Sequence, residues 1–260
     1  MPINNIVASV THIQCLKQGQ RNSVATGFFY VHKDNLYLIT NRHVVISEVD
    51  NYFPDEIQLR LHMTPSDLSQ NADYLVPLYD RNANPLWLQH PQYGKEVDVV
   101  ALPMDKDQIS SRFFVKAFSE SDHIPQDMDI SIGEDVIVMG YPLGFHDALH
   151  NLPIVRNALM ATVYPVPFGG MPAVLIDARL HRGTSGSPVL TKASNIIRRI
   201  DGSTSFMDKA VQYLVGVQSG AWDSKNRDPK IDEPLGLNLV WFASLIPEII
   251  TQGGNTIVKI

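Results

Sequence analysis

Short runs of alternating apolar and polar residues are spread along most of this chain. The clearest is Glu56–His62, whose strict alternation predicts a strand with one buried and one exposed face. Residues 28–31 and 36–40 flank the turn-like sequence Lys33-Asp34-Asn35 and predict a β-hairpin. Residues 6–16 alternate loosely and predict the first strand of the fold.

The first half of the chain holds one more predicted strand pair, formed by residues 74–78 and 86–89. Residues 113–130 are predicted to be a linker, after which short apolar runs resume. The candidate strands there are residues 135–140, 155–163, 173–180, 189–191, 213–218 and 237–242. A short helix is predicted at 245–251, because Gly253-Gly254 forms a natural stop.

Short strands separated by turn signals at this spacing are typical of all-β barrels. The sequence therefore predicts an all-β fold of two antiparallel β-barrels with a short C-terminal helix. We place one barrel at residues 1–112, and the linker, the second barrel and the helix at residues 113–260. The polar insertions 192–210 and 222–234 are expected to be surface loops.

The composition limits the possible classes of function. The chain has 260 residues, of which 44% are hydrophobic. No apolar run reaches the roughly 18 residues of a membrane-spanning helix. The net charge is −6, and the basic pair Arg198-Arg199 is too short to form a phosphate-binding surface. We therefore expect no nucleic-acid partner and no membrane partner.

The N-terminus and the single cysteine bear on the cellular location. Residues 1–5 lack the basic region and the long apolar run of a signal peptide. Cys15 alone cannot form an internal disulfide, whereas secreted proteins often carry several. We therefore expect a cytoplasmic protein, although the mature form of a secreted precursor would have a similar sequence.

The strongest chemical motif is the sequence Gly-Thr-Ser-Gly-Ser-Pro at residues 183–188. A serine that transfers acyl groups needs a base to take its proton and backbone N–H groups to bind the oxyanion. Gly183 can bring its N–H close to a substrate because it has no Cβ, and Gly186 lets the chain turn sharply after Ser185. Taken alone, this stretch also suits a Gly/Ser surface turn.

A histidine and an acid precede this serine in the chain. His43 ends an apolar run that is predicted to be a strand, and Asp98 lies within the apolar run 97–102. Burying an unpaired carboxylate is unfavourable, so Asp98 needs a partner. A histidine ring that it holds in the correct orientation is such a partner. A satisfied core histidine and a strand-start cap are the alternative interpretations of the two residues. With Ser185, however, they form the combination of a Ser-His-Asp triad.

The order of His43, Asp98 and Ser185 along the chain narrows the choice of fold. Chymotrypsin has this order, whereas subtilisin and the α/β-hydrolases have others. No histidine follows Ser185 in the sequence. Ser187 also stands where the Gly-x-Ser-x-Gly motif of the α/β-hydrolases has its last glycine. The order of the three residues and the missing Gly-x-Ser-x-Gly motif therefore exclude an α/β-hydrolase.

With these motifs the chain resembles the trypsin-like (chymotrypsin-fold) serine peptidases, and most of all their HtrA-like and glutamyl-endopeptidase-like bacterial branches, without a PDZ domain. The matching segments are residues 25–29, 38–45, 98–102, 140–144, 183–189 and 216–220. Arg42 stands where the family usually has a small residue, and Ser187 where glycine is common. The resemblance implies a chymotrypsin-like double β-barrel over about residues 6–250.

The resemblance also implies a role for each site residue. Ser185 would attack the peptide carbonyl, His43 would take and return the proton, and Asp98 would orient His43. The N–H groups of Gly183 and Ser185 would form the oxyanion hole. A strand edge for the substrate backbone would be offered by Ser219, Gly220 and Ala221.

The resemblance further places the pocket for the side chain before the scissile bond. The pocket residues would be Arg179, Leu180, His181, Gln218 and Asn238. None of them is acidic, so a preference for cleavage after lysine or arginine is not expected. Two alternatives remain for the substrate residue before the scissile bond. Arg179 or His181 favours an acidic side chain there, or Arg179 faces solvent and Leu180 forms a small apolar pocket.

The implied function is that of a serine endopeptidase acting on protein or peptide substrates, an intracellular regulatory or defence-type protease of narrow specificity. A catalytically inactive fold that serves as a binding or sensor module is the alternative, and an esterase is a third interpretation. Thr184 stands where digestive zymogens carry an ion-pairing aspartate. We therefore expect control by loop order or a regulatory protein partner rather than by N-terminal cleavage.

Two features are reminiscent of other chemistry. His146 and His150 have the spacing of zinc-binding helices, yet no third ligand is obvious, and a loop is expected there. Cys15 has no electropositive sequence neighbours that would make it a nucleophile. No metal and no cofactor are therefore expected.

Overall fold

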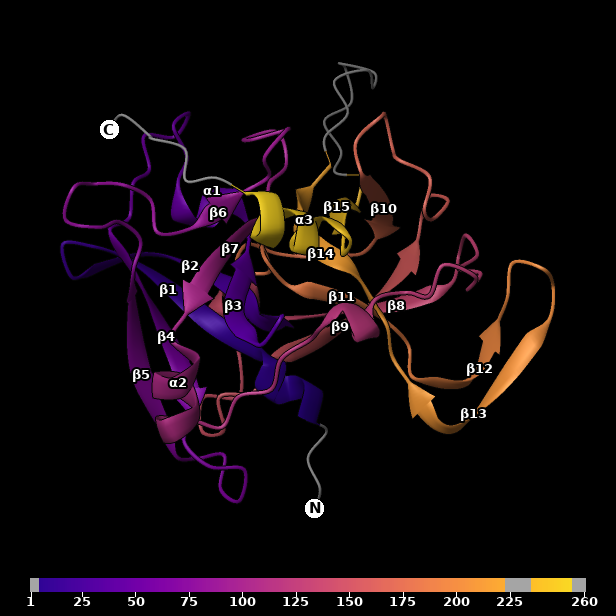
Figure 1. Ribbon diagram of the computed structural model, residues 1–260, viewed down its shortest axis with the longest axis horizontal. Coiled ribbons are helices and arrows are strands. Elements are labelled where there is room, and N and C mark those ends of the chain that lie inside the picture. Colours follow the sequence, from indigo (N-terminus) through magenta and orange to yellow (C-terminus); the bar gives the residue numbers. More distant parts are fainter. Residues whose placement is uncertain (1–4, 223–234, 254–260) are drawn as a thin grey trace.

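Two groups of β-strands, one from each half of the chain, make up the fold. The computed structural model describes residues 5–222 and 235–253. Figure 1 shows the N-terminal strands on one side of the molecule and the C-terminal strands on the other. The predicted all-β class with a short C-terminal helix is confirmed.

The first group is a seven-stranded antiparallel sheet in the order β5-β4-β1-β2-β3-β7-β6. Its strands are β1 (Val10–Lys17), β2 (Gln20–His32), β3 (Asn35–Thr40), β4 (Glu56–His62), β5 (Asn71–Pro77), β6 (Leu88–Gln89) and β7 (Val100–Met104). The predicted hairpin is formed by β2 and β3, and Lys33 and Asp34 in its turn have φ of 46° and 67°. Two consecutive positive φ angles are what a two-residue hairpin turn requires. The strictly alternating run at residues 56–62 is β4, as predicted.

Several N-terminal elements differ from the sequence prediction. The 3₁₀ helix η1 (Asn5–Ser9) precedes β1, and helix α2 (Lys106–Arg112) was not predicted. The predicted pair of residues 74–78 and 86–89 meets only next to its turn, where the Leu86 N–H donates to the Leu78 carbonyl oxygen at 2.9 Å. Over their length β5 pairs with β4 and β6 pairs with β7. Alternation within a strand shows which face is buried, but it does not identify the neighbouring strand.

The second group is a closed barrel in the order β10-β15-β14-β11-β8-β9. Its strands are β8 (Asp135–Gly140), β9 (Ile154–Met160), β10 (Ala173–Asp177), β11 (Pro188–Thr191), β14 (Leu214–Ala221) and β15 (Leu237–Phe242). All six coincide with predicted strands to within a few residues at each end. The predicted linker, residues 113–130, contains the short 3₁₀ helix η2 (Glu120–Asp122) and none of the numbered strands.

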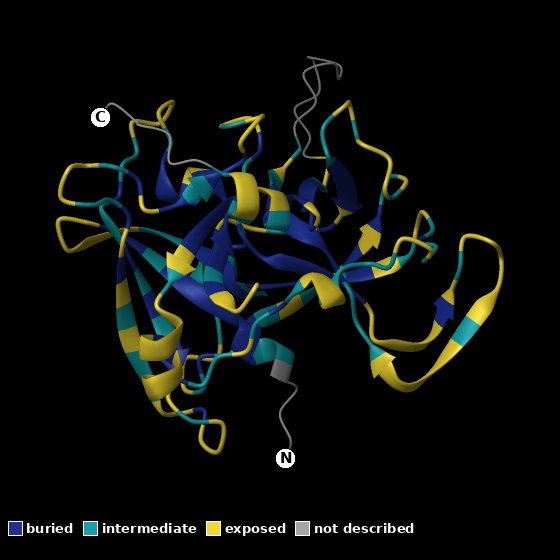
Figure 2. Ribbon diagram, in the orientation of Figure 1, coloured by how far each residue is buried: buried dark blue, intermediate teal, exposed yellow. Residues whose placement is uncertain are grey.

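An additional hairpin leaves the barrel after β11. Its strands, β12 (Ser194–Arg198) and β13 (Thr204–Val211), form a separate two-stranded sheet. Figures 1 and 2 show it as an arm that projects from the body and is largely exposed. Residues 192–210 are thus at the surface, as predicted, but they form a hairpin rather than a loop. The other predicted loop, 222–234, lies outside the described residues except for Trp222.

The hydrophobic core continues from one group of strands into the other (Figure 2). One cluster of buried side chains contains Phe28 from the first sheet, Leu175 from the barrel and Ile246 from α3 (Leu245–Gln252). This helix is the predicted C-terminal helix. Since each large apolar side chain contributes about 1.5–3 kcal/mol when fully buried, the shared core holds the two groups of strands together.

A loop of the second group, residues 141–152, is tied to the first sheet by a hydrogen bond from the buried Asn151. The side-chain amide of Asn151 donates from Nδ2 to the Arg60 carbonyl oxygen at 2.7 Å. Tyr141 Oη donates to the Asn151 carbonyl oxygen at 3.1 Å. Asn151 is 1% exposed and has a φ of 50°, a conformation that asparagine tolerates better than most residues.

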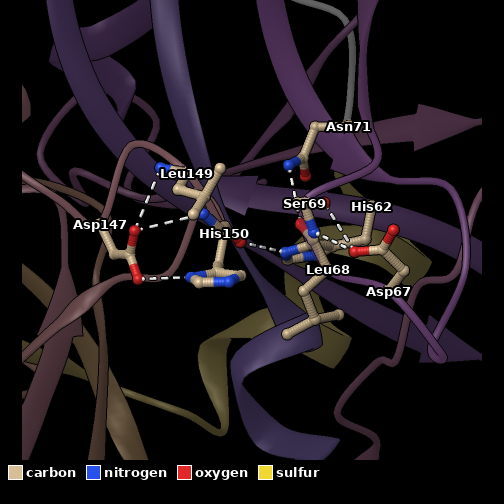
Figure 3. A network of polar contacts seen from close by, with 8 residues as sticks. All are labelled: His62, Asp67, Leu68, Ser69, Asn71, Asp147, Leu149 and His150. Atoms are coloured by element: carbon tan, nitrogen blue, oxygen red, sulfur yellow. Dashed lines mark hydrogen bonds and ion pairs between the residues drawn. The ribbon is translucent and has the colours of Figure 1, made fainter.

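Figure 3 shows a second tether of the same loop. His62, the last residue of β4, donates from Nε2 to the His150 carbonyl oxygen at 2.8 Å. The His150 ring is held by Asp147 at 2.8 Å, and Asp147 also accepts the backbone N–H groups of Leu149 and His150. Burial keeps the pKa of His62 below its usual value, which favours the neutral ring with a single N–H donor.

We predict that Asn151→Ala destabilises the protein by about 1–3 kcal/mol, because it leaves the Arg60 carbonyl without its amide donor in the interior. Thermal or urea unfolding measures this loss. Asn157→Ala is the matched control, since Asn157 is exposed on β9. If the two variants are equally stable, the tether at Asn151 does not contribute to stability.

Candidate active site

Ser185 lies in a tight turn between Gly183 and Gly186. Both glycines have positive φ, 92° and 85°, a region that favours glycine. A Cβ on Gly183 would lie 2.5 Å from the Tyr141 carbonyl oxygen, and a Cβ on Gly186 would collide with the Thr26 carbonyl oxygen. At both positions glycine is therefore required, because a Cβ has no room and because the backbone has a positive φ.

Hydrogen bonds fix this turn between β2 and β14. The Thr26 N–H donates to the Ser185 carbonyl oxygen at 2.9 Å, and Thr26 Oγ1 donates to the Gly183 carbonyl oxygen at 2.8 Å. On the other side, the Gly186 N–H donates to the Gln218 carbonyl oxygen at 2.9 Å. Ser185 is half-buried and lines a surface pocket, so it is both fixed and accessible.

The peptide that precedes Gly183 is oriented by the loop that follows β8. The Leu143 N–H donates to the Arg182 carbonyl oxygen at 2.6 Å. Because the C=O and N–H of a trans peptide point to opposite sides, the Gly183 N–H points away from Leu143. Among the described residues, no protein acceptor is bound to the N–H of Gly183 or of Ser185. Both groups can therefore donate to a ligand.

His43 and Asp98 form a hydrogen-bonded pair. Asp98 Oδ2 lies 2.6 Å from His43 Nδ1, and Asp98 Oδ1 accepts the His43 backbone N–H at 2.9 Å. Asn41 Nδ2 donates to the Asp98 carbonyl oxygen at 2.7 Å. A carboxylate at Nδ1 keeps the proton on that nitrogen, which leaves Nε2 free to act as a base.

The local structure around these two residues differs from the sequence prediction. Strand β3 ends at Thr40, and His43 lies in the short helix α1 (Arg42–Val45) rather than at the end of the strand. Asp98 precedes β7 and does not lie within it. Both residues therefore belong to connections next to strands, where side chains from different elements can meet.

A further donor to Asp98 comes from the second group of strands. Ser219 Oγ, on β14, donates to Asp98 Oδ2 at 2.5 Å. The sequence assigned Ser219 to the substrate-binding edge and gave no sign of a contact with Asp98. The two residues are 121 positions apart, so no local pattern could reveal a contact that forms only when the two groups of strands pack together.

The surroundings of His43 favour its protonated form. Burial alone lowers the pKa of His43, but the hydrogen bond and the charge of Asp98, with a contribution from Asp50, more than offset this effect. The net result is a pKa above the usual value of about 6.5. His43 is therefore a stronger base than a free imidazole.

One pocket is lined by both His43 and Ser185. Its volume is about 550 Å³, and Gly183 also lies on its wall. The structure thus joins His43, Asp98 and Ser219 in one hydrogen-bonded group, and Ser185 lines the same pocket as His43. A nucleophile, a base and a group that orients the base are the parts that acyl transfer needs.

The residues expected to bind the side chain before the scissile bond differ in exposure. Gln218 and Asn238 are buried, Leu180 is half-buried, and Arg179 and His181 are exposed. On β14, Gly220 is half-buried and Ala221 is exposed. Asn238 Nδ2 donates to the Ala178 carbonyl oxygen at 2.6 Å, so its amide is engaged within the fold. In the described part of the chain, Gln218 Oε1 is buried without a hydrogen-bond partner.

The residues reminiscent of other chemistry have structural contacts. His146 Nδ1 lies 2.7 Å from the Gly144 carbonyl oxygen, whereas the His150 ring contacts Asp147. Residues 5–222 and 235–253 contain no group of three or more His, Cys, Asp or Glu that could hold a metal ion. Burial raises the pKa of Cys15, which favours the unreactive thiol. Within the same ranges, no helix has the length and apolar character that a membrane span needs.

Several solved structures match the chain. One is the serine endoprotease from Yersinia pestis, with 14% identity, 94% of this chain and 62% of that chain covered, and a TM-score of 0.49. Another is the Rv3671c protease from M. tuberculosis H37Rv in its inactive form, with 19% identity and a TM-score of 0.46. The match covers 97% of this chain and 94% of that chain. A serine-to-alanine mutant of Rv3671c, also in the inactive form, has 18% identity and a TM-score of 0.47. The match covers 98% of this chain and 94% of that chain. This chain spans less than two thirds of the Yersinia protein chain.

The sequence itself matches a family model. No curated protein matches the chain. The family described as "Trypsin-like peptidase domain" matches residues 25–197, which is more than half of the 260 residues. The matched range contains His43, Asp98 and Ser185. The chain therefore belongs to the trypsin-like peptidase domain family.

Proposed function

We propose that the chain hydrolyses peptide bonds with Ser185 as the nucleophile, His43 as the general base and acid, and Asp98 as the residue that orients His43. The observation that carries this proposal is the run of hydrogen bonds from Ser219 through Asp98 to His43, next to a pocket that Ser185 lines. The Asp98 carboxylate accepts three hydrogen bonds, two of them from His43. Such fixation suits a base that must accept and return a proton without moving.

In this mechanism the Ser185 hydroxyl attacks the substrate carbonyl carbon while His43 Nε2 takes its proton. The resulting oxyanion accepts hydrogen bonds from the N–H groups of Gly183 and Ser185. His43 then donates its proton to the leaving amine, and an acyl-enzyme remains on Ser185. Water, deprotonated by His43, hydrolyses the acyl-enzyme. The negative charge of Asp98 stabilises the imidazolium in both halves of the reaction.

The substrate backbone is proposed to pair with the end of β14. Ser219, Gly220 and Ala221 lie there, and the last two become progressively more exposed. An extended peptide that adds to this edge as a further strand gains main-chain hydrogen bonds. Protein and peptide segments in an extended conformation are therefore the proposed substrates.

We predict that Ser185→Ala abolishes peptide hydrolysis while leaving the fold intact. The loss of a triad nucleophile costs roughly a millionfold in subtilisin. Active-site labelling with a fluorophosphonate probe and a peptide-cleavage assay measure the effect, and circular dichroism checks the fold. Ser203→Ala, in the exposed turn of the β12–β13 arm, is the matched control and should label and cleave like the wild type.

Two outcomes would contradict this assignment. One is peptide cleavage that survives in a clean Ser185→Ala preparation, since the nucleophile would then lie elsewhere. The other is a folded wild type that neither takes the probe nor cleaves any peptide of a proteome-derived library. That result would favour the inactive binding or sensor module over the protease.

The rate should depend on pH through His43. Only the neutral ring can take the Ser185 proton, and the pKa of His43 is raised, so kcat/KM should fall as the pH drops, with a midpoint above about 6.5. A peptide without titratable side chains is the appropriate substrate. Asp98→Asn should lower the rate by roughly ten-thousandfold and move the midpoint downward. A wild-type midpoint below 6.5 would contradict the proposed environment of His43.

Cleavage after lysine should be poor. None of the five residues proposed to form the pocket before the scissile bond is acidic, so a lysine ammonium would enter it without a charged partner. We expect kcat/KM for a peptide with lysine at that position to be at least about tenfold lower than for the better of the leucine and glutamate peptides. A series of otherwise identical peptides measures this preference. Efficient cleavage after lysine would show that other residues form the pocket.

A further inference from the structure

The pocket that His43 and Ser185 share has walls from three parts of the chain. Ser23, Val24 and Ala25 of β2 form one wall, and Arg182, Gly183 and Ser185 form another. The third wall consists of His43 and Val44 of α1 with Ser47, Asp50 and Tyr52 of the segment that follows α1. The volume of about 550 Å³ is large enough for one or two amino-acid side chains of a bound peptide.

This pocket lies on the leaving-group side of Ser185. The proposed backbone-binding edge at Ser219, Gly220 and Ala221 holds the part of the substrate before the scissile bond. None of these three residues lines the pocket, although Ser185 and Gly183 do. A peptide that crosses Ser185 therefore has its acyl part at β14 and its leaving part in the pocket between β2 and the segment after α1.

Residues 46–52, directly after α1, carry two acidic residues with different surroundings. Glu48 is engaged by Arg42, which donates to its two carboxylate oxygens at 2.6 and 2.9 Å. The Arg42 guanidinium lowers the pKa of Glu48 to about 2. Its charge is thus neutralised by a fixed partner. Among the described residues, Asp50 forms no ion pair, and its carboxylate accepts one hydrogen bond, from Ser47 Oγ at 2.6 Å.

Asp50 is close enough to the reacting groups to act on them. It lines the same pocket as His43 and contributes to the electrostatic environment of the His43 ring. His43 must protonate the leaving amine, so the first residue after the scissile bond lies beside His43. The side chain of that residue is therefore the part of the substrate nearest to the unpaired Asp50 carboxylate.

We propose that Asp50 makes the leaving-group side of this site select substrates with lysine or arginine directly after the scissile bond. The proposal rests on the proposed function, since it assumes that Ser185 is the nucleophile and His43 the base. Ser47 positions the carboxylate, Arg42 is engaged by Glu48, and among the described residues Asp50 forms no ion pair with any cation. Bound substrate displaces water from the pocket, which strengthens the attraction between Asp50 and a substrate cation.

Arg182 also lines the pocket and carries a positive charge. Its backbone carbonyl oxygen is held by Leu143, and its side chain is exposed. Arg182 lies next to Gly183, on the Ser185 side of the pocket rather than on the His43 side. Its charge opposes a basic residue close to Ser185, and Asp50 is the one acidic residue among the described residues that line this pocket.

The experiment uses the full chain and a proteome-derived peptide library. Cleaved peptides are sequenced to give the frequency of each residue directly after the cut, and kcat/KM is then measured for three peptides that differ only there, with lysine, glutamine or glutamate. Wild type should prefer lysine to glutamate by about fivefold, the upper range for an accessible ion pair. Asp50→Asn should abolish this preference, whereas Asp208→Asn, an exposed acid on the β13 arm, should keep it.

Two further readouts make the outcome unambiguous. Fluorophosphonate labelling of Ser185 in each variant reports the catalytic machinery separately from the leaving-group preference. Raising the salt concentration should weaken the preference for lysine in the wild type, because salt screens accessible charges. Equal rates for the three peptides, or a lysine preference that Asp50→Asn retains, would overturn the role of Asp50. The proposed function would still stand in that case if Ser185 is labelled. If Ser185 is not labelled and no peptide is cut, the proposed function fails.

Discussion

The buried side chain of Thr26 joins the parts of the molecule that must come together at the candidate site. Its hydroxyl donates to the Gly183 carbonyl oxygen at 2.8 Å and accepts the Tyr141 N–H at 3.0 Å. Its backbone N–H donates to the Ser185 carbonyl oxygen, and its carbonyl oxygen accepts from Thr40 Oγ1 at 2.8 Å. One residue of β2 thus positions the serine turn, the start of the loop after β8 and the end of β3. Since Thr26 is 0% exposed, each of these bonds lies where losing a partner leaves a buried polar group unpaired.

Much of this arrangement could be predicted from sequence, because the chemistry and the conformation impose rare residues. Gly183 and Gly186 stand out in the sequence, and the structure explains both by a positive φ and by the absence of space for a Cβ. The alternation of β4 and the hairpin turn at Lys33 and Asp34 are equally local signals. The order of His43, Asp98 and Ser185 adds a constraint on topology that no single motif provides.

The remaining features depend on contacts between distant segments. The partner of β5 is β4 rather than the next strand along the chain, and alternation cannot distinguish the two. The polar arm β12–β13 looks like a loop in sequence because it has no face in the core over most of its length. The contact of Ser219 with Asp98 forms only when the two groups of strands pack together, and the bond from Leu143 to Arg182 joins two separate loops of the barrel. Neither has a signature in the residues around it.

The division of the site between two groups of strands makes its geometry depend on their packing. His43 and Asp98 belong to the first group, whereas Ser185 and Ser219 belong to the second. The orientation of the Gly183 N–H rests on the bond from Leu143, a residue with a φ of 55° that costs about 1–2 kcal/mol for a non-glycine side chain.

The loop that contains Leu143 compensates for this strain through its bonds to β4. Asn151 contacts the Arg60 carbonyl oxygen, and His62 contacts the His150 carbonyl oxygen. These bonds are far from Ser185 in sequence, yet they hold the segment that orients the peptide before Gly183. The same hydrogen bonds that join the two groups of strands therefore also set the direction of the N–H group proposed to bind the oxyanion.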